Sequence, residues 1–406
     1  MTAFDPGARP ETSYAWLRLA ASLALMTIGG AGMYAVAVAL PPVQAEFGVA
    51  RSDASLPYAA TMIGFGLGGI LMGRLSDRFG VMVPVLVGAV CLGLGFIAAG
   101  HASSLWQFIL LQGLLIGLLG TSPTFAPLVA DTSMWFTRRR GIAVAICASG
   151  NYLAGAVWPP LLQHFFDTSG WRATFTGVGV FCLLTMIPLG FALKRKPPVP
   201  GAHAEHALER KSLDVPPKTL TALLCVAGLA CCVAMSMPQV HIVAYCADLG
   251  YTAARGAEML SLMLGFGIVS RLLSGWICDR IGGLRTLLLG SALQGVALFL
   301  FLPFDGLVSL YVVSALFGLF QGGIVPSYAI IVREYFPPAE AGAKVGLVIM
   351  FTLLGMALGG WMTGVIFDWT GSYRAAFLNG IGWNLLNMAI AATLLYRSGR
   401  MRPQPA

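Results

Sequence analysis

The sequence Gly-Arg-Leu-Ser-Asp-Arg-Phe-Gly at residues 73–80 ends one long apolar stretch, and Gly-Trp-Ile-Cys-Asp-Arg-Ile-Gly at residues 275–282 ends another. Both segments keep a glycine, an aspartate, an arginine and a second glycine at the same relative positions. A further pair of similar segments lies at residues 166–172 and 367–374, again in corresponding places. The chain is therefore predicted to contain two copies of one structural unit in parallel register.

Composition places the chain in a membrane. Hydrophobic residues make up 57% and charged residues 10%, and the mean hydropathy is +0.79. These values exclude a soluble globular protein, whose charged fraction is about 25%. The net charge of +8 does not indicate nucleic-acid binding, because the basic residues lie in short loops between apolar stretches rather than along one face or helix.

The apolar stretches are each long enough to cross a hydrocarbon layer as a helix. The predicted fold class is an all-α polytopic membrane protein, with twelve transmembrane helices in two six-helix pseudo-symmetric halves. The predicted spans are residues 17–40, 55–73, 82–100, 105–130, 141–166, 173–193, 219–247, 258–278, 285–303, 307–332, 343–367 and 375–396.

Lysine and arginine predict the orientation. They gather in the N-terminus, in the loops after even-numbered spans and in the C-terminus, whereas the opposite loops hold only Arg51, Arg172, Arg255 and Arg374. Both termini are therefore expected in the cytoplasm, with the protein in the cell inner (plasma) membrane. The N-terminus lacks the pattern of a cleaved secretory signal, so the first span is expected to be retained. The predicted parts are a tail (1–16), an N-terminal bundle (17–193), a linker (194–218), a C-terminal bundle (219–396) and a second tail (397–406).

The paired segments at 73–80 and 275–282 resemble the signature of the major facilitator superfamily, and the resemblance covers nearly the whole chain. Within that superfamily the chain resembles the monocarboxylate transporter-like branch, through Arg271 in the eighth span, the segment 241–250 and Gly-Trp-Arg at 170–172. This resemblance implies alternating access and a substrate site between the two bundles near the membrane midplane.

Arg271 is the one charged residue that hydropathy places deep inside a predicted span. It lies about 12 Å along the helix from Asp279, which is too deep for its side chain to reach the rim easily. Ionisable residues inside spans usually mark a substrate or ion pathway. The alternative is a structural arginine whose donors are satisfied by backbone carbonyls or neighbouring helices.

A pathway arginine predicts an organic anion as substrate, because a guanidinium binds a carboxylate through two parallel hydrogen bonds. Away from their ends the predicted spans contain no other charge, so a monocarboxylate would neutralise the site whereas a dicarboxylate would leave an excess charge. The alternative function is export of a drug-like or neutral solute, with Arg271 structural. Uptake and efflux, and uniport, proton symport and anion exchange, all stay open.

The acidic residue that the resembling branch often has one turn before the arginine is replaced by Gly267. This departure removes the usual carboxylate for proton coupling. Protons are then a possible second partner through His241, whose alternative role is a hydrogen bond at the outer edge.

Four polar residues are predicted to join Arg271 in binding substrate: Tyr34, Asn151, His241 and Tyr328. The resemblance places their spans, the first, fifth, seventh and tenth, around the central cavity. The alternative for each is a structural hydrogen bond between helices, which is common in membrane bundles.

The repeated segments also predict a cytoplasmic gate. Asp77 and Arg78 end a helix at the rim, and Gly73 allows a neighbouring backbone to approach, so the carboxylate can hold two helices together. Asp279 and Arg280 occupy the corresponding positions in the second half. The alternative is that the arginines serve orientation alone.

No cofactor, metal site or enzyme activity is expected. The eight cysteines lack paired CxxC spacing, and the sequence contains no HExxH motif. A sensor without transport activity would usually carry a signalling domain, for which the chain offers no segment. The lipid bilayer is the expected surrounding, nucleic acid is not an expected partner, and a monomer suffices for the fold.

Overall fold

The computed structural model describes residues 11–197 and 215–400, apart from the side chains of 338, 339, 399 and 400. These residues form helices and connecting turns, without a β-strand in either range. The helices are α1 (Ser13–Gly29), α2 (Ala31–Val38), α3 (Leu40–Phe47), α4 (Arg51–Phe79), α5 (Met82–Gly100), α6 (Leu105–Leu110), η1 (Leu111–Thr121), η2 (Ser122–Thr124), α7 (Ala126–Trp135), α8 (Arg140–Ser169), α9 (Trp171–Phe191), α10 (Pro217–Asp248), α11 (Ala253–Ile281), α12 (Gly283–Leu300), α13 (Leu307–Gln321), α14 (Ile324–Tyr335), α15 (Pro338–Thr370) and α16 (Tyr373–Arg400).

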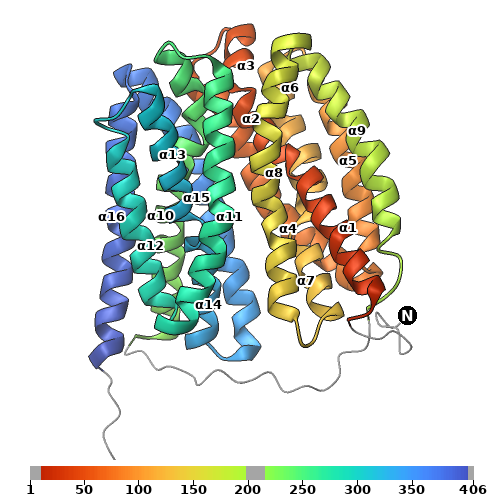
Figure 1. Ribbon diagram of the computed structural model, residues 1–406, viewed down its shortest axis with the longest axis vertical. Coiled ribbons are helices and arrows are strands. Elements are labelled where there is room, and N and C mark those ends of the chain that lie inside the picture. Colours follow the sequence, from red (N-terminus) through yellow and green to blue (C-terminus); the bar gives the residue numbers. More distant parts are fainter. Residues whose placement is uncertain (1–10, 198–214, 401–406) are drawn as a thin grey trace, which may run out of the picture.

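Two bundles stand side by side, one made of α1 to α9 and the other of α10 to α16 (Figure 1). Across the described ranges, twelve helical segments are long and apolar enough to cross a membrane, which confirms the predicted all-α fold. The predicted division into tails, bundles and linker stays a prediction, because residues 1–10, 198–214 and 401–406 lie outside the described residues.

Three spans are interrupted rather than continuous. The first changes direction at Gly29 and Gly30, between α1 and α2. The fourth contains the π-helical segment η1, and the tenth is divided between α13 and α14 by Gly322 and Gly323. Glycine permits close helix crossing: a Cβ at Gly64 of α4 would collide with the backbone of η1. Glycines at two of the breaks also pack on a neighbour, since a Cβ at Gly29 would collide with Thr124 and one at Gly323 with Ser274.

The positions of four helix ends define two opposite faces of the molecule. The first residue of α1, the end of α9, the start of α10 and the end of α16 all lie on the same side, drawn at the bottom of Figure 1. This side is called the terminal face, and the opposite side the distal face. Because α4 starts at the distal face and α15 ends there, these two helices run antiparallel.

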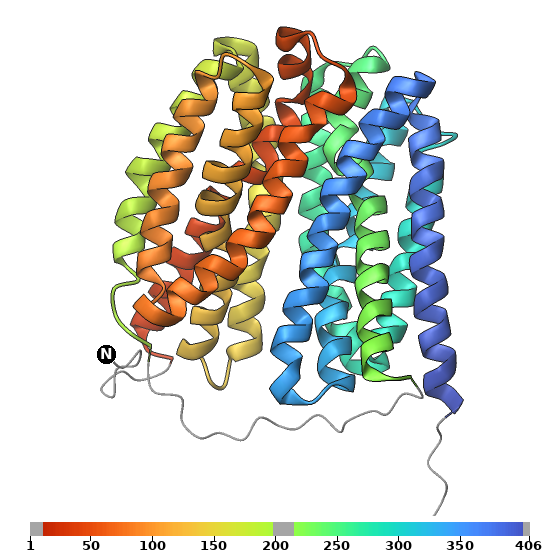
Figure 2. The ribbon, with the colours of Figure 1, turned by 180° about the vertical axis from the view of Figure 1, so that it is seen from behind.

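The bundles meet along two seams, one between α4 and α15 and the other between α8 and α11. Figure 2 shows the two bundles from behind. On the first seam, the backbone of Arg51 lies against Gly364, the Tyr58 ring lies against Gly360, and the position of Gly66 faces Met350. The contacts thus run from the distal face to about the middle of the helices.

The second seam follows the same course. The Ser261 hydroxyl of α11 donates to the carbonyl of Ala156 in α8, and further toward the terminal face Arg271 donates to the carbonyl of Ala148. One turn beyond Arg271, a Cβ at Gly275 would meet no atom within 4 Å, and the same holds at Gly141 of α8. Contact between α8 and α11 therefore ends between Arg271 and the terminal face.

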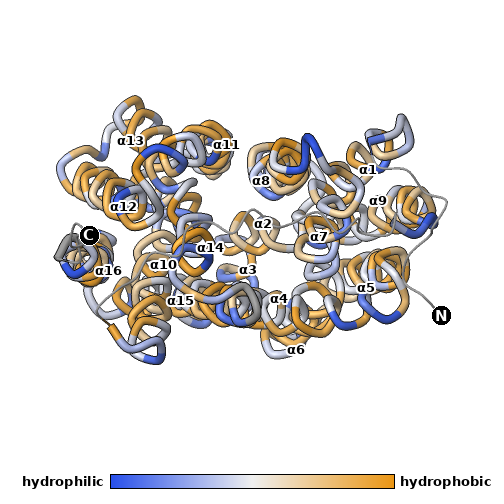
Figure 3. Tube along the Cα trace, turned by 90° about the horizontal axis from the view of Figure 1, so that it is seen from below, coloured by the Kyte–Doolittle hydropathy of each residue, from blue (hydrophilic) through white to orange (hydrophobic). Residues whose placement is uncertain are grey.

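The first seam opens in the same half. A Cβ at Gly69 or Gly73 of α4, or at Gly342 or Gly346 of α15, would meet no atom within 4 Å. Figure 3 views the molecule from this terminal face, with the two bundles side by side. The structure is therefore closed between the bundles at the distal face and open toward the terminal face.

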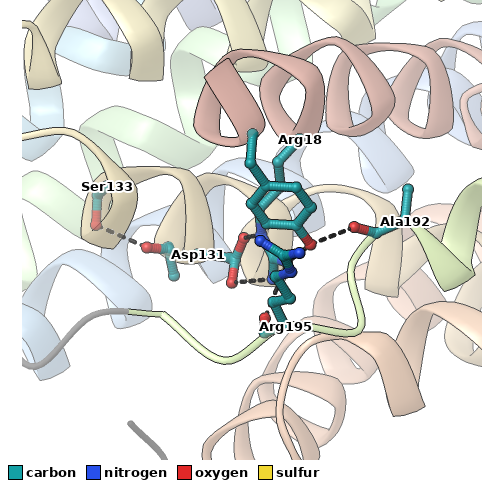
Figure 4. A network of polar contacts seen from close by, with 7 residues as sticks. Arg18, Asp131, Ser133, Ala192 and Arg195 are labelled. Atoms are coloured by element: carbon teal, nitrogen blue, oxygen red, sulfur yellow. Dashed lines mark hydrogen bonds and ion pairs between the residues drawn. The ribbon is translucent and has the colours of Figure 1, made fainter. Parts of the chain in front are cut away.

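One sequence-based expectation is wrong: Arg271 is not alone inside the spans. Arg18 of α1 and Asp131 of α7 form a buried ion pair, each with 2% of its side chain exposed. Arg18 Nε and Nη2 donate to the carboxylate at 2.7 and 2.8 Å, and Nη1 donates to the carbonyl of Arg195 (Figure 4). Asp131 lies one residue beyond the predicted fourth span, and the helix continues past it to Trp135. The pair carries no net charge and ties α1 to α7 and to the chain leaving α9.

This pair predicts a steep cost for removing one partner. Asp131→Asn would leave the Arg18 guanidinium buried without a counter-charge, so we expect a loss of about 3–5 kcal/mol of stability, measured as thermal unfolding in detergent. Arg18→Met combined with Asp131→Leu should recover most of that loss. The control, Arg255→Gln, breaks an exposed pair within one helix, which solvent screens, and should leave the unfolding temperature nearly unchanged. A single variant as stable as the control would contradict this assignment.

Candidate functional site

Arg271 lies on the α8–α11 seam at the level where the two bundles separate. Its Nη1 donates to the Ala148 carbonyl at 3.2 Å, and its Cζ lies 4.4 Å from the centre of the Tyr152 ring. Its Nε is buried without a hydrogen-bond partner. No described carboxylate lies within 4.0 Å of the guanidinium. The charge is therefore held by one carbonyl and one aromatic face.

This environment leaves the guanidinium under-satisfied. An arginine has five N–H donors, of which the structure provides one with an acceptor. A cation–π contact stabilises the charge by about 1–2 kcal/mol, far less than the cost of removing an ion from water. An anion at this position would offer both an acceptor for Nε and a counter-charge.

Three tyrosines of the N-terminal bundle lead to this position. Tyr152 of α8 stacks on Arg271, and Tyr34 of α2 is close enough to interact electrostatically with both. Tyr58 of α4 is in turn close to Tyr34 and packs on Gly360 of α15. All three rings are buried, yet none of their hydroxyls makes a hydrogen bond among the described residues. The N-terminal bundle thus places tyrosines with unused hydroxyls next to a cation of the C-terminal bundle, and these four residues are called the Arg271 cluster from here on.

Gly267 has a structural reason within the Arg271 cluster. It lies one turn before Arg271, and a Cβ there would collide with the ring of Tyr152. A side chain at this position, acidic or not, would push the ring off the guanidinium. The aromatic face of Tyr152 therefore occupies the place where a carboxylate on α11 would otherwise stand.

The structure brings together only part of the predicted substrate site. Tyr34 and Arg271 belong to the same cluster. Asn151, half-buried and with no side-chain hydrogen bond to another described residue, is the neighbour of Tyr152 on α8. Tyr328 lies apart: it is fully buried inside the C-terminal bundle, where its hydroxyl donates to Asn387 at 2.8 Å.

His241 also lies apart from the Arg271 cluster, near the distal face. Its Nε2 is 2.8 Å from the Gly360 carbonyl and its Nδ1 is 3.2 Å from the Tyr373 hydroxyl. A neutral ring that donates from Nε2 and accepts at Nδ1 satisfies both contacts, since the Tyr373 oxygen itself accepts from Arg51. This is the structural hydrogen-bonding role given above as the alternative for His241.

Tyr58 and Tyr152 were not predicted to bind substrate. Each is a tyrosine within an apolar span, which is a signal the sequence does provide. The contact of Tyr152 with Arg271, and of Tyr58 with α15, depends on how the two bundles face each other, and a single helix does not reveal that.

The predicted gate residues lie at the terminal face, where the bundles are apart. Asp77 and Asp279 are exposed and make no hydrogen bond or ion pair among the described residues. Arg78 and Arg280 stack on Phe79 and Trp276 of their own helices, and no atom would touch a Cβ at Gly73. Their gating role stays a prediction, and in this conformation none of these residues bridges the bundles.

Comparison with known proteins assigns the family. A sequence profile described as Major Facilitator Superfamily matches residues 21–308 and 247–406. The chain belongs to the Major Facilitator Superfamily. This confirms the resemblance inferred from the repeated segments, and family and fold are those of transporters rather than enzymes.

Curated relatives of this superfamily member include monocarboxylate transporters. Monocarboxylate transporter 13 of Rattus norvegicus is 29% identical over 84% of this chain and 78% of its own length. Monocarboxylate transporter 11 of Homo sapiens is 26% identical over 92% of this chain and 81% of its own. The MFS-type transporter pynF of Aspergillus niger, 26% identical over 81% of this chain and 75% of its own, bears no such name.

Solved transporters share the fold of this superfamily member. A bacterial homologue of the human lysosomal transporter Spinster, in an inward-facing and occupied conformation, superposes with a TM-score of 0.72 at 15% identity, over 98% of this chain and 100% of that one. A point mutant of the nucleoside transporter NupG superposes with a TM-score of 0.73 at 12% identity, over 95% of this chain and 100% of that one.

The gate assignment predicts a change in conformational balance. If Asp77 helps to close the terminal face in the opposite state, Asp77→Asn should favour the conformation seen here. A cysteine at Gly346, which faces the open part of the α4–α15 seam, should then react several-fold faster with a polar thiol reagent. The matched control is Asp53→Asn, at the other end of α4. Equal rates in both variants would remove Asp77 from the gate.

Proposed function

We propose that the protein moves a small organic anion, a monocarboxylate, across the plasma membrane by alternating access, with Arg271 as the binding site for the carboxylate. The observation that supports this proposal is the unpaired guanidinium at the boundary of the two bundles. It is a half-buried cation with a buried, unused Nε donor, next to Tyr152 and Tyr34, whose hydroxyls are also unused among the described residues.

Charge balance selects the substrate class. Arg18 and Arg51 are each bonded to a carboxylate of the protein, so neither needs a counter-ion from outside in this conformation. One carboxylate at Arg271 would make the occupied site neutral, and a neutral site costs less to enclose in a low-dielectric interior. A dicarboxylate would bring one negative charge too many.

The orientation follows the distribution of basic residues. Lysine and arginine concentrate at the terminal face, which we therefore assign to the cytoplasm, with the distal face outside. The structure then corresponds to a state open to the cytoplasm and closed to the outside.

The names of two relatives agree with a monocarboxylate, whereas fungal relatives are described only as MFS-type transporters. The alternative, export of a neutral or drug-like solute with a structural Arg271, would require other acceptors for the guanidinium. Proton coupling through His241 is not part of the proposal, because that ring is already satisfied on both nitrogens and lies in another network.

The role of Arg271 predicts different results for two substitutions. Arg271→Lys keeps the charge but loses the planar fork, and Arg271→Gln loses both, so uptake of radiolabelled lactate or pyruvate into proteoliposomes should fall about ten-fold and about 100-fold or more. Arg255→Gln, on the same helix but exposed, is the control. Wild-type uptake by Arg271→Gln would end the proposal, and transport of neutral solutes by that variant would favour the alternative.

The packing of Gly267 provides an independent prediction. Gly267→Ala should displace the Tyr152 ring from Arg271 and raise KM about ten-fold, the magnitude of a lost cation–π contact in a partly desolvated site. Gly265→Ala is a matched control on the same helix, since its added Cβ would meet Ala156 at an ordinary 3.9 Å. Equal KM values for the two alanine variants would show that the ring position does not matter for binding.

A further inference from the structure

A second arginine, Arg51, joins the two bundles at the distal face. Its Nη1 and Nη2 donate to the two oxygens of Asp248 at 3.0 and 3.2 Å, and its Nη1 also donates to the Tyr373 hydroxyl at 2.6 Å. Its guanidinium lies 4.6 Å from the centre of the Phe367 ring. Arg51 begins α4 in the N-terminal bundle, whereas all three partners belong to the C-terminal bundle.

The start of α4 is bound across the same boundary. The residue before the helix, Ala50, has no side chain that can cap the first turn. Asp368 of α15 caps it instead, with its two carboxylate oxygens accepting from the backbone N–H groups of Arg51 and Ser52 at 2.9 and 2.8 Å. A carboxylate at a helix N-terminus is stabilised by the unpaired N–H groups and the helix dipole.

These contacts cannot survive opening of the distal face. Alternating access in this fold moves one bundle against the other, so Asp248 and Asp368 would move away from Arg51 together. Among the described residues, the N-terminal bundle offers no replacement nearby. Glu46 is already bonded to Arg172 and Trp171, and Asp53, two residues after Arg51, is exposed, makes no ion pair in the closed state and does not face Arg51 on the helix. Opening would leave Arg51 without a carboxylate.

Arg51 is reached by a cleft from the distal face and lies on the same seam as Tyr58 of the Arg271 cluster. A cleft of about 340 Å³ between the α3–α4 turn and α10 reaches both Arg51 and Asp248 from the distal face. Along α4, Tyr58 lies two turns further in and faces the same helix, α15, that Arg51 faces. Arg51 thus lies at the distal end of the α4–α15 seam, which further in contains Tyr58 of the Arg271 cluster.

We propose that Arg51, clamped by Asp248 and Asp368, closes the outer gate, and that the same guanidinium, once released, is the first binding station for the substrate carboxylate. The second part rests on the proposed function, because it assumes an anionic substrate. The gate and the station use one charge in turn: a carboxylate of the protein holds it when the gate is closed, and a carboxylate of the substrate when it is open.

The test uses a thiol reporter and two reagents that differ in charge. Ala244 of α10 is buried and lines the cleft, so we would introduce Ala244→Cys into the full chain in detergent and measure its reaction rates. The reagents are an anionic sulfonatoethyl and a cationic trimethylammoniumethyl methanethiosulfonate. The chain without Ala244→Cys corrects for the native cysteines, seven of which are buried.

The two rates report separate properties. Their common rise measures opening, and their ratio measures the local potential. Asp248→Asn should raise both rates several-fold, and Asp368→Asn, a second route to the same opening, should do so as well. In the Asp248→Asn background, Arg51→Gln should lower the anionic-to-cationic ratio about five-fold, as expected for the loss of a unit charge within a Debye length. Arg51→Lys should keep the ratio, and Arg255→Gln should leave it unchanged.

Two results would overturn the proposal. Unchanged rates in both aspartate variants would show that these carboxylates do not hold the gate. An unchanged ratio after Arg51→Gln would show that the released guanidinium does not attract anions. Neither result depends on the transported substrate, so failure here is distinct from normal transport by Arg271→Gln, which would refute the proposed function instead.

Discussion

The unpaired charge of Arg271 is the constraint on which the other features of the site depend. Among the described residues two arginines are buried, Arg18 and Arg51, and each is neutralised by bidentate contact with an aspartate. Arg271 has one carbonyl and one aromatic face instead. Gly267 makes room for that aromatic face. The contacts between the bundles at the distal face close off the site from that side of the molecule. Because Arg18 and Arg51 are paired with aspartates of the protein, the missing counter-charge at Arg271 supports the proposal that a ligand provides it.

The distribution of ion pairs also describes the conformation. At the distal face Arg51 binds residues of the other bundle, whereas at the terminal face Asp77 and Asp279 bind none of the described residues. During alternating access, contacts between the bundles must form at the terminal face as they are lost at the distal face. The free energies of the two sets need to be similar, because a state favoured by several kcal/mol would rarely be left.

Much of the fold could be predicted because hydropathy and the repeated segments report on single helices. That Arg271 and Tyr34 lie inside apolar spans could be predicted for the same reason, and their role in binding substrate stays a prediction. Asp131 was missed because it lies at the very end of its apolar stretch, where hydropathy does not distinguish a rim residue from a buried one. Arg51 looked like a loop residue, and Tyr328 like a cavity residue, because only the packing of one bundle on the other, and of helices within a bundle, decides which neighbours each side chain meets.

The most direct test compares acids with their uncharged amides. In proteoliposomes containing the wild-type protein, counterflow would be measured with lactate and pyruvate and with the corresponding primary amides, which have nearly the same shape. If Arg271 provides the binding energy through charge, the acids should exchange and the amides should exchange at least about 100-fold less. Equal counterflow of acids and amides would contradict the claim that the unpaired guanidinium selects the substrate.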